Sequence, residues 1–363
     1  MCAHDCGFRW RACLAVLTLT VGLLAGCAAD GGGSGSGPGD DDDTSSATGT
    51  GTGGDDECEG VDFPVAGRPP AFLIVLDSSS SMQAMDSWTN VVTAITTVTA
   101  QLDWQVRFGL LIFPDGQELC AMTSPWPEVP VGDFNAGEIA TVLGESAPNG
   151  GGTPTARALL YGFQHLLALS GDSDRFVILA TDGAPNCSDD PGLTCQGGCV
   201  SSVDGNCEFD EICLDDQAVY AHAGEYYQNW GIATYVVGLG GVVEMWDDVM
   251  STIALHGGTG DYYPALDPQA LVDALQEIAA ENTDCTFDVD WGALDIGTSS
   301  DPGLVNVETD GDEILFSADC ADAQGWHWLD EDTIELCPGL CHDYKWGIVH
   351  VIHATFGCES VVE

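Results

Sequence analysis

The stretch that decides the fold is AFLIVLDSSSS, from Ala71 to Ser81. Its first six residues are all apolar, which is typical of a short strand that is buried on both faces, and such strands occur in parallel sheets. Asp77 and four serines follow at once. Because the ligands of parallel sheets bind at the carboxyl ends of the strands, these oxygen-bearing side chains form a candidate binding site.

Short apolar runs continue to alternate with amphipathic stretches from residue 71 to residue 281. Three further runs predict buried strands, at residues 106–113, 176–180 and 232–237. Helical spacing of apolar residues predicts helices within 88–102 and 159–167, and a last helix begins at Pro268 after the N-cap Asp267. This alternation implies an α/β fold, in which helices flank an open and mostly parallel sheet.

Two more polar clusters follow at expected carboxyl ends of strands. Gly150-Gly-Gly-Thr-Pro-Thr155 opens a helix, and Thr181-Asp-Gly183 follows a strand. Hydroxyl and carboxylate oxygens from three loops suit a hard divalent cation, and Mg²⁺ in particular takes few carboxylates while it retains water. Two aspartates would leave the ion under-neutralised, so we expect it to accept a carboxylate from a partner in an open position.

The pattern Asp77-x-Ser79-x-Ser81, followed by Thr153 and Asp182, resembles the von Willebrand factor type A (VWA) domain over about residues 68–283. In that family, whose fold is Rossmann-like, these positions form the metal-ion-dependent adhesion site, which usually holds Mg²⁺ or Mn²⁺; Ca²⁺ is a third candidate here. The resemblance implies that the serines and the threonine coordinate by hydroxyl, and the aspartates directly or through water. It also implies a non-enzymatic adhesion module that binds a protein ligand through a metal-bound carboxylate.

Several alternatives stay open at this point. Thr155 is a second candidate for the threonine position, although Thr153 fits the family pattern better. The serines could instead form a polar turn, with Thr153 serving only as a helix N-cap. At the level of function, the alternatives are a structural subunit of an envelope complex and a metal-dependent hydrolase. The hydrolase is disfavoured because no histidine falls in the three loops to act as a general base.

The N-terminus carries an export signal. Two arginines precede an apolar run over residues 12–24, which is typical of a secretory signal peptide and too short to span a bilayer comfortably. The run leads into Leu24-Ala-Gly-Cys27, which resembles the lipobox of bacterial lipoproteins and implies a lipid on Cys27; a chance cysteine is the alternative. The same resemblance implies the outer membrane, because the residue after the cysteine is Ala28 rather than Asp. The predicted location is therefore the bacterial cell envelope, at the outer membrane or cell surface, with membrane contact by the lipid anchor only.

The composition excludes several functions. Seven Lys and Arg face 58 Asp and Glu, a formal charge of −51. Nucleic acid is excluded as a partner because neutralising phosphates requires basic side chains. Nucleotide binding is not indicated either, since Gly238-Leu-Gly-Gly lacks the third glycine of a dinucleotide loop. A hydrophobic content of 45% is nevertheless typical of a folded protein.

Sixteen cysteines in an exported chain indicate disulfide bonds. Signal cleavage would remove three and lipidation would use one, which leaves an even number: Cys58, Cys120, Cys187, Cys195, Cys199, Cys207, Cys213, Cys285, Cys320, Cys337, Cys341 and Cys358. The grouping favours a clasp between Cys58 and Cys285, three bridges in the middle group with Cys120 as the outside partner, and two bridges among the last four. Pairing within each group stays open.

These observations divide the chain into four segments. Residues 1–26 are a lipoprotein signal peptide, and residues 27–57 are a lipidated cysteine with a flexible tether. Residues 58–285 are a VWA domain with a cysteine-rich insertion at 187–213, and residues 286–363 are a small disulfide-stapled β domain. Period-two alternation and the turn signal Asp310-Gly311 predict the antiparallel strands of the last segment. The insertion begins five residues after Asp182, so we expect it to overhang the metal loops. It either selects the partner or is a stabilised decoration.

Overall fold

The computed structural model describes residues 61–64, 69–115, 120, 122–148, 151–171, 173–187, 214–240, 246–289, 302–350 and 352–356. The predicted signal peptide, the lipidated Cys27, the tether and residues 188–213 of the predicted insertion lie outside these residues. Within the described ranges, no helix has both the length and the apolarity that crossing a membrane requires.

A six-stranded sheet runs in the order β4-β3-β2-β5-β6-β7. Its strands are β2 (Ala71–Asp77), β3 (Arg107–Phe113), β4 (Val129–Gly132), β5 (Arg175–Thr181), β6 (Ala233–Leu239) and β7 (Tyr263–Ala265). All neighbours pair in parallel except the edge strand β4, which is antiparallel to β3. Every residue of β2 is buried, as its unbroken apolar run predicts. The predicted open, mostly parallel sheet is therefore confirmed.

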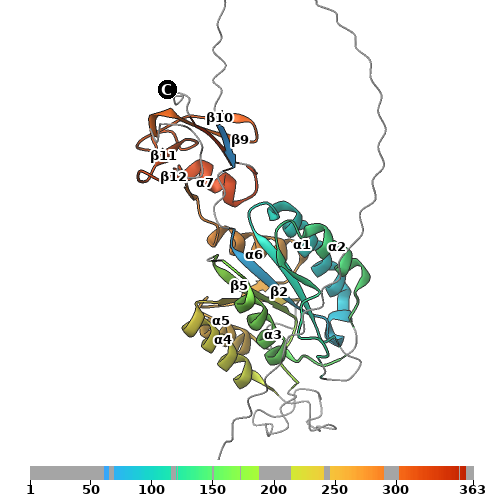
Figure 1. Cartoon of the computed structure of the whole chain (residues 1–363). Helices are drawn as coiled ribbons and strands as arrows, with labels where there is room; N and C mark the ends of the chain where they lie inside the picture. The colour runs from blue at the N-terminus through green and yellow to red at the C-terminus, as the bar shows by residue number, and fades with distance from the viewer. Residues whose placement is uncertain are drawn as a thin grey trace, which may run out of the picture. The chain divides into compact units, whose positions relative to one another are not determined.

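Helices cover both faces of this sheet (Figure 1). One face packs against α1 (Ser87–Leu102), α2 (Ala136–Glu145) and α6 (Pro268–Glu281), and the other against α3 (Thr155–Ala168), α4 (Asp216–Trp230) and α5 (Asp247–His256). Successive residues of β2 alternate between the two layers, with Ile74 in the first and Val75 in the second. We call the elements from β2 to α6 the sheet domain.

Capping fixes where α6 begins. The Asp267 carboxylate accepts the backbone N–H of Ala270 at 2.9 Å, and Pro268 occupies the first turn. Both features are those that the sequence predicts for this helix start.

The remaining elements form two small antiparallel sheets, which we call the tail domain. One sheet has the order β1-β13-β9-β10, with β1 (Val61–Pro64), β13 (Ile352–Phe356), β9 (Val305–Thr309) and β10 (Asp312–Ile314). The other has the order β11-β12-β8, with β11 (Trp326–Trp328), β12 (Thr333–Leu336) and β8 (Thr286–Asp288). Two short helices complete the domain, η3 (Pro302–Leu304) and α7 (Pro338–Lys345).

Two features of the tail domain follow from its turns and its pairing. The predicted hairpin joins β9 to β10 through Asp310 and Gly311, which have φ angles of 51° and 89°. Such positive φ angles suit an Asp-Gly turn. β1 precedes the sheet domain in sequence but pairs with β13, so Val61 lies opposite Phe356. The chain thus contributes strands to this sheet both before and after the sheet domain.

Three disulfides are described: Cys120–Cys187, Cys285–Cys341 and Cys320–Cys337. The first gives the cysteine-rich stretch the outside partner that its odd count requires. The predicted clasp between Cys58 and Cys285 is wrong, because Cys285 is bonded to Cys341 inside the tail domain. The other cysteines for which disulfides were predicted lie outside the described residues: Cys58, Cys195, Cys199, Cys207, Cys213 and Cys358.

Candidate metal centre

Asp77 lies at the carboxyl end of β2 and is completely buried. Its Oδ1 accepts the backbone N–H of Ser79 at 2.8 Å, and its Oδ2 accepts the hydroxyl of Thr181 at 2.6 Å. Thr181 ends β5, the parallel neighbour of β2, so the sheet itself brings the two side chains together. Both carboxylate oxygens are thereby held in a fixed orientation.

A chain of hydroxyl groups connects this loop to Asp182. The Ser79 and Ser81 hydroxyl oxygens lie 3.0 Å apart, and the Ser81 hydroxyl donates to Asp182 Oδ1 at 2.7 Å. Ser79 and Asp182 are buried. Ser81, the second residue of the 3-10 helix η1 (Ser80–Asp86), is exposed. The cluster therefore reaches solvent at one end.

The loop that carries Thr153 is tied to both other loops. The N–H of Ser80 donates to the carbonyl of Gly151 at 3.2 Å. On the other side, the N–H of Thr153 donates to Asn186 Oδ1 at 2.7 Å, and the N–H of Asn186 donates back to the Thr153 carbonyl at 3.3 Å. The structure thus assembles all three predicted loops at one edge of the sheet.

The local geometry differs between the two threonines. Helix α3 begins at Thr155 after Pro154, and no side chain caps it. The proposal that Thr153 serves only as an N-cap is therefore wrong. The Thr155 hydroxyl donates to the Thr153 carbonyl at 3.4 Å, whereas the Thr153 contacts described above come from its backbone. This difference favours Thr153, which is 3% exposed, as the hydroxyl donor.

The ionised forms of the two carboxylates are destabilised. Burial and the negative charge of Asp182 raise the pKa of Asp77 to about 7. The hydrogen bonds from Thr181 and Ser79 act in the opposite direction and lower this pKa. Burial also raises the pKa of Asp182, although the hydrogen bond from Ser81 lowers it. A cation beside both groups would favour their ionised forms and remove this penalty.

The donor set fits a hard cation. We call Asp77, Ser79, Ser81, Thr153 and Asp182 the three-loop site. Its ligands are oxygen atoms only, which suits Mg²⁺, Mn²⁺ or Ca²⁺ rather than a soft metal. In the part of the chain that the structure describes, no group of three or more His, Cys, Asp or Glu side chains could hold a metal. An ion at the three-loop site would therefore depend on hydroxyl oxygens and water as well as on its two aspartates.

Sequence reasoning named Thr181 within a polar cluster without assigning it a role, and it missed Asn186. Thr181 orients Asp77, and Asn186 holds the Thr153 backbone. The role of Thr181 could have been predicted, since it directly precedes Asp182 at the end of an apolar run, but nothing in the sequence marks Asn186. The next residue, Cys187, is bonded to Cys120, so a disulfide fixes the chain where the cysteine-rich stretch leaves the site.

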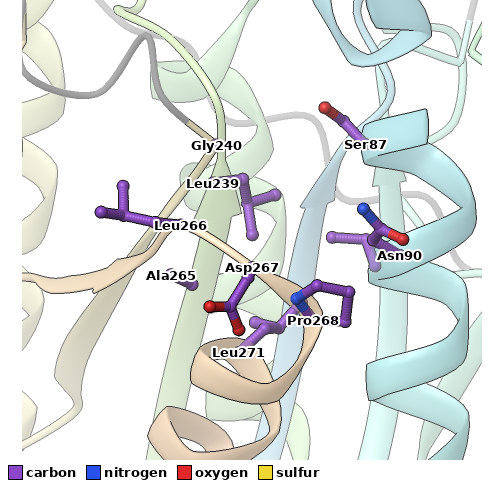
Figure 2. Close-up of a pocket in the computed structure, with 10 residues that line it drawn as sticks. Ser87, Asn90, Leu239, Gly240, Ala265, Leu266, Asp267, Pro268 and Leu271 are labelled. Carbon is purple, nitrogen blue, oxygen red and sulfur yellow. The ribbon is translucent and has the colours of Figure 1, made fainter. Parts of the chain in front are cut away.

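A cavity of about 180 Å³ lies at the same sheet edge, between the start of α1, the end of β6 and the start of α6 (Figure 2). Its polar lining includes Ser87, Asn90 and Asp267, and Leu271 lines its apolar side. The Asp267 carboxylate already caps α6. The cavity thus has both polar and apolar walls, and none of its lining residues belongs to the three-loop site.

Comparison with known proteins gives matches of two kinds. Residues 72–290 match the von Willebrand factor type A domain. No curated protein matches. Among solved structures, the pilus adhesin SpaC from Lactobacillus rhamnosus GG is 16% identical with a TM-score of 0.48, and the alignment covers 80% of this chain and 39% of SpaC.

Two further solved structures have similarly low sequence identities and TM-scores. The VWA domain of the type V pili tip protein Mfa5 from Porphyromonas gingivalis is 12% identical with a TM-score of 0.40, over 60% of this chain and 94% of that one. The manganese-loaded TRAP protein of Plasmodium vivax is 16% identical with a TM-score of 0.40, over 59% and 75%. Since the domain match spans more than half of the 363 residues, the chain belongs to the von Willebrand factor type A family.

Proposed function

We propose that this protein is a divalent-metal-dependent binding module of the bacterial envelope. Asp77, Ser79, Ser81, Thr153 and Asp182 would hold Mg²⁺ or Mn²⁺, with Ca²⁺ as the alternative. The single observation that carries this proposal is the set of contacts that joins the three loops: side chains link Asp77 through Ser79 and Ser81 to Asp182, and hydrogen bonds of the backbone tie the Thr153 loop to both sides. The raised pKa of both aspartates supports it, because a cation would stabilise the buried negative charge.

The ligand would complete the metal shell with a carboxylate. Two aspartates and three neutral hydroxyls would leave an ion with coordination positions for water or an external oxygen. The exposed end of the cluster, at Ser81, gives a ligand its route to the metal. A metal-bound carboxylate would also explain how a chain with a formal charge of −51 binds an acidic group of a protein partner.

This function makes and breaks no bond. The described contacts of the five side chains include no histidine, and the two carboxylates that accept hydroxyl groups would be engaged by the metal. In the envelope, a lipid on Cys27 would anchor the protein to the outer membrane, and the small, acidic residues up to 57 would act as a spacer.

The test is a calorimetric titration of Mg²⁺ and Mn²⁺ into the mature, oxidised chain. We expect one saturable site, lost in Asp77→Ala and weakened at least about tenfold in Thr153→Ala, since even the partners of metal ligands contribute 10- to 100-fold. The acidic spacer binds ions weakly in every variant, so it cancels from the comparison.

Ser80→Ala is the matched control. Its exposed side chain lies in the same serine run, but the contact described for Ser80 comes from its backbone N–H. Equal loss of affinity in Ser80→Ala and Thr153→Ala would contradict the assigned donor set. A parent protein that binds neither ion, with or without a carboxylate ligand present, would reject the metal-dependent function.

A further inference from the structure

The tail domain contains a groove of about 490 Å³ that the proposed function does not use. It lies among β11, β12 and α7, and its polar and aromatic lining consists of His327, Glu335, His342, Lys345 and Trp346. We call these five residues the tail groove. Its volume falls within the range of pockets that hold small molecules.

Covalent bonds fix the walls of the tail groove. Cys341 of α7 is bonded to Cys285, at the start of the sheet that contains β12. Cys337, the residue before α7, is bonded to Cys320. The helix that carries Lys345 is therefore held at both ends of its first turn, and a preorganised wall lowers the entropy cost of binding a ligand.

Lys345 is the only lysine among the 363 residues. Within the described ranges, none of the ion pairs includes it, although the chain has 58 acidic residues. The nearby carboxylates are engaged elsewhere: Glu335 pairs with His327 at 3.0 Å, and Asp343 lies 3.2 Å from His342. The ammonium group of Lys345 is therefore available to an anion.

Trp346 gives the tail groove a flat apolar surface. Its ring is stacked near that of His342, with centroids 5.9 Å apart and planes at 28°, and the residue is 37% exposed. Imidazole nitrogens and the Glu335 carboxylate flank this surface. A ligand with an apolar face and several hydroxyl groups matches both kinds of wall, whereas a wholly apolar acid would take these polar side chains out of water without offering them any hydrogen bond.

We propose that the tail groove binds a sugar that carries one carboxylate group, that is, a uronic acid. The carboxylate would pair with Lys345, the sugar ring would lie against Trp346, and its hydroxyls would bond to Glu335 and His342, since both ring nitrogens of His327 already have partners. The formal charge of −51 disfavours polyanions, because the field of the whole protein repels them at long range. This site is separate from the three-loop site and needs no metal.

The test is a titration of the mature chain with glucuronate in the presence of EDTA, followed by saturation-transfer NMR. Glucose, which has a hydroxymethyl group in place of the carboxylate, and N-acetylalanine, which has a carboxylate without a sugar, are the comparison probes. We expect saturable binding of glucuronate, at least about tenfold tighter than either comparison probe, because a charge-assisted hydrogen bond adds to the ring contact.

Lys345→Gln should weaken glucuronate binding about tenfold at an unchanged melting temperature. Arg157→Gln, in the sheet domain, is the matched control: it changes the net charge equally and should leave binding unaltered. Trp346→Ala should weaken binding as well. Equal losses in Lys345→Gln and Arg157→Gln, equal binding of N-acetylalanine, loss of binding in EDTA, or no saturable binding of glucuronate would each overturn the proposal.

Discussion

The sheet domain and the tail domain reach a stable fold by different means. The sheet domain buries two apolar layers, one on each face of a sheet whose central strand β2 is buried throughout. The tail domain has strands of three to five residues around one small core, in which Trp326 is the largest buried side chain, and two disulfides join its elements. Disulfides thus stabilise the tail domain, whereas buried apolar area stabilises the sheet domain.

This difference has a consequence for function. Burying two carboxylates costs free energy. The apolar layers stabilise the sheet domain enough to offset this cost at the carboxyl ends of its strands, whereas a less stable fold would not tolerate it. In the tail domain, by contrast, the paired side chains of His350 and Asp310 are both at least 40% exposed. We therefore expect the two domains to respond differently to reduction and to pH.

Removing the tail disulfides should have the largest effect. Chain-entropy arguments give about 4 kcal/mol for Cys285–Cys341 and about 3 kcal/mol for Cys320–Cys337, more than a small domain can lose. We expect the quadruple Cys→Ser variant to lose hydrogen-exchange protection in β9 and β12 while β2 and β5 stay protected. Metal titration should be unchanged in this variant.

The matched control is the pair Cys120→Ser and Cys187→Ser, which removes the disulfide next to Asn186. This control should leave the tail domain protected and weaken metal binding, because the Thr153 loop is tied to Asn186. Loss of protection in β2 and β5 in the quadruple variant would mean that the two domains fold as one unit, and the comparison would fail.

The second effect is the pH dependence that Asp77 gives to the metal-free protein. Its pKa is raised from 3.8 to about 7, so between these values the unfolded chain has lost the proton while the folded chain keeps it. Stability therefore falls as pH rises through this window, by about 4 kcal/mol in total at 1.36 kcal/mol per pKa unit. Above pH 7 the loss is complete.

Asp77→Asn should flatten most of this dependence, with Asp182 responsible for the remainder. Urea denaturation at pH 5 and pH 8 in EDTA measures the change, and the exposed Asp288→Asn serves as the control. Adding Mg²⁺ at pH 8 should stabilise the parent but not Asp77→Asn. A parent protein that is more stable at pH 8 than at pH 5 without metal would show that the buried pair is not under strain.

The two domains also differ in how far the sequence predicts them. β2, α1, α6 and the Asp267 cap follow from local patterns. The loops after β2 and β5 must meet because these strands are parallel neighbours, whereas the Thr153 loop follows helix α2 and its role was predicted from the family resemblance. Asn186 was not predictable, since its role depends on the path of a loop rather than on a strand end.

The tail domain depends on contacts distant in sequence. β1 and β13 lie at opposite ends of the folded chain, and a four-residue strand carries no signal for its partner. Helix α7 was missed because it buries only Leu340 and Tyr344, too few residues for a helical period. The partner of Cys285 depends on where this helix packs, which explains why the clasp with Cys58 was predicted wrongly.

The smallest expected effect comes from His165 at the edge of the sheet domain. The N–H of Val131 in β4 donates to His165 Nε2 at 3.1 Å, which requires an unprotonated nitrogen, and burial lowers the pKa of His165. Below about pH 6.5, the usual histidine value, the unfolded chain takes up a proton before the folded chain does. Stability should therefore fall as the pH falls, and β4 should lose protection first.

Substitutions at His165 separate the hydrogen bond from the titration. His165→Gln keeps an acceptor for the Val131 N–H without a titrating group, so it should remove the acid sensitivity of β4. His165→Leu should cost about 1–2 kcal/mol at every pH, because the N–H loses its partner. Hydrogen exchange at Val131 at pH 5.5 and 7.5 measures both effects. In the tail domain His327, His342 and His350 lie beside carboxylates, whereas His165 accepts the N–H of a strand. If the acid sensitivity of β4 persisted in His165→Gln, this hydrogen bond would not be its cause.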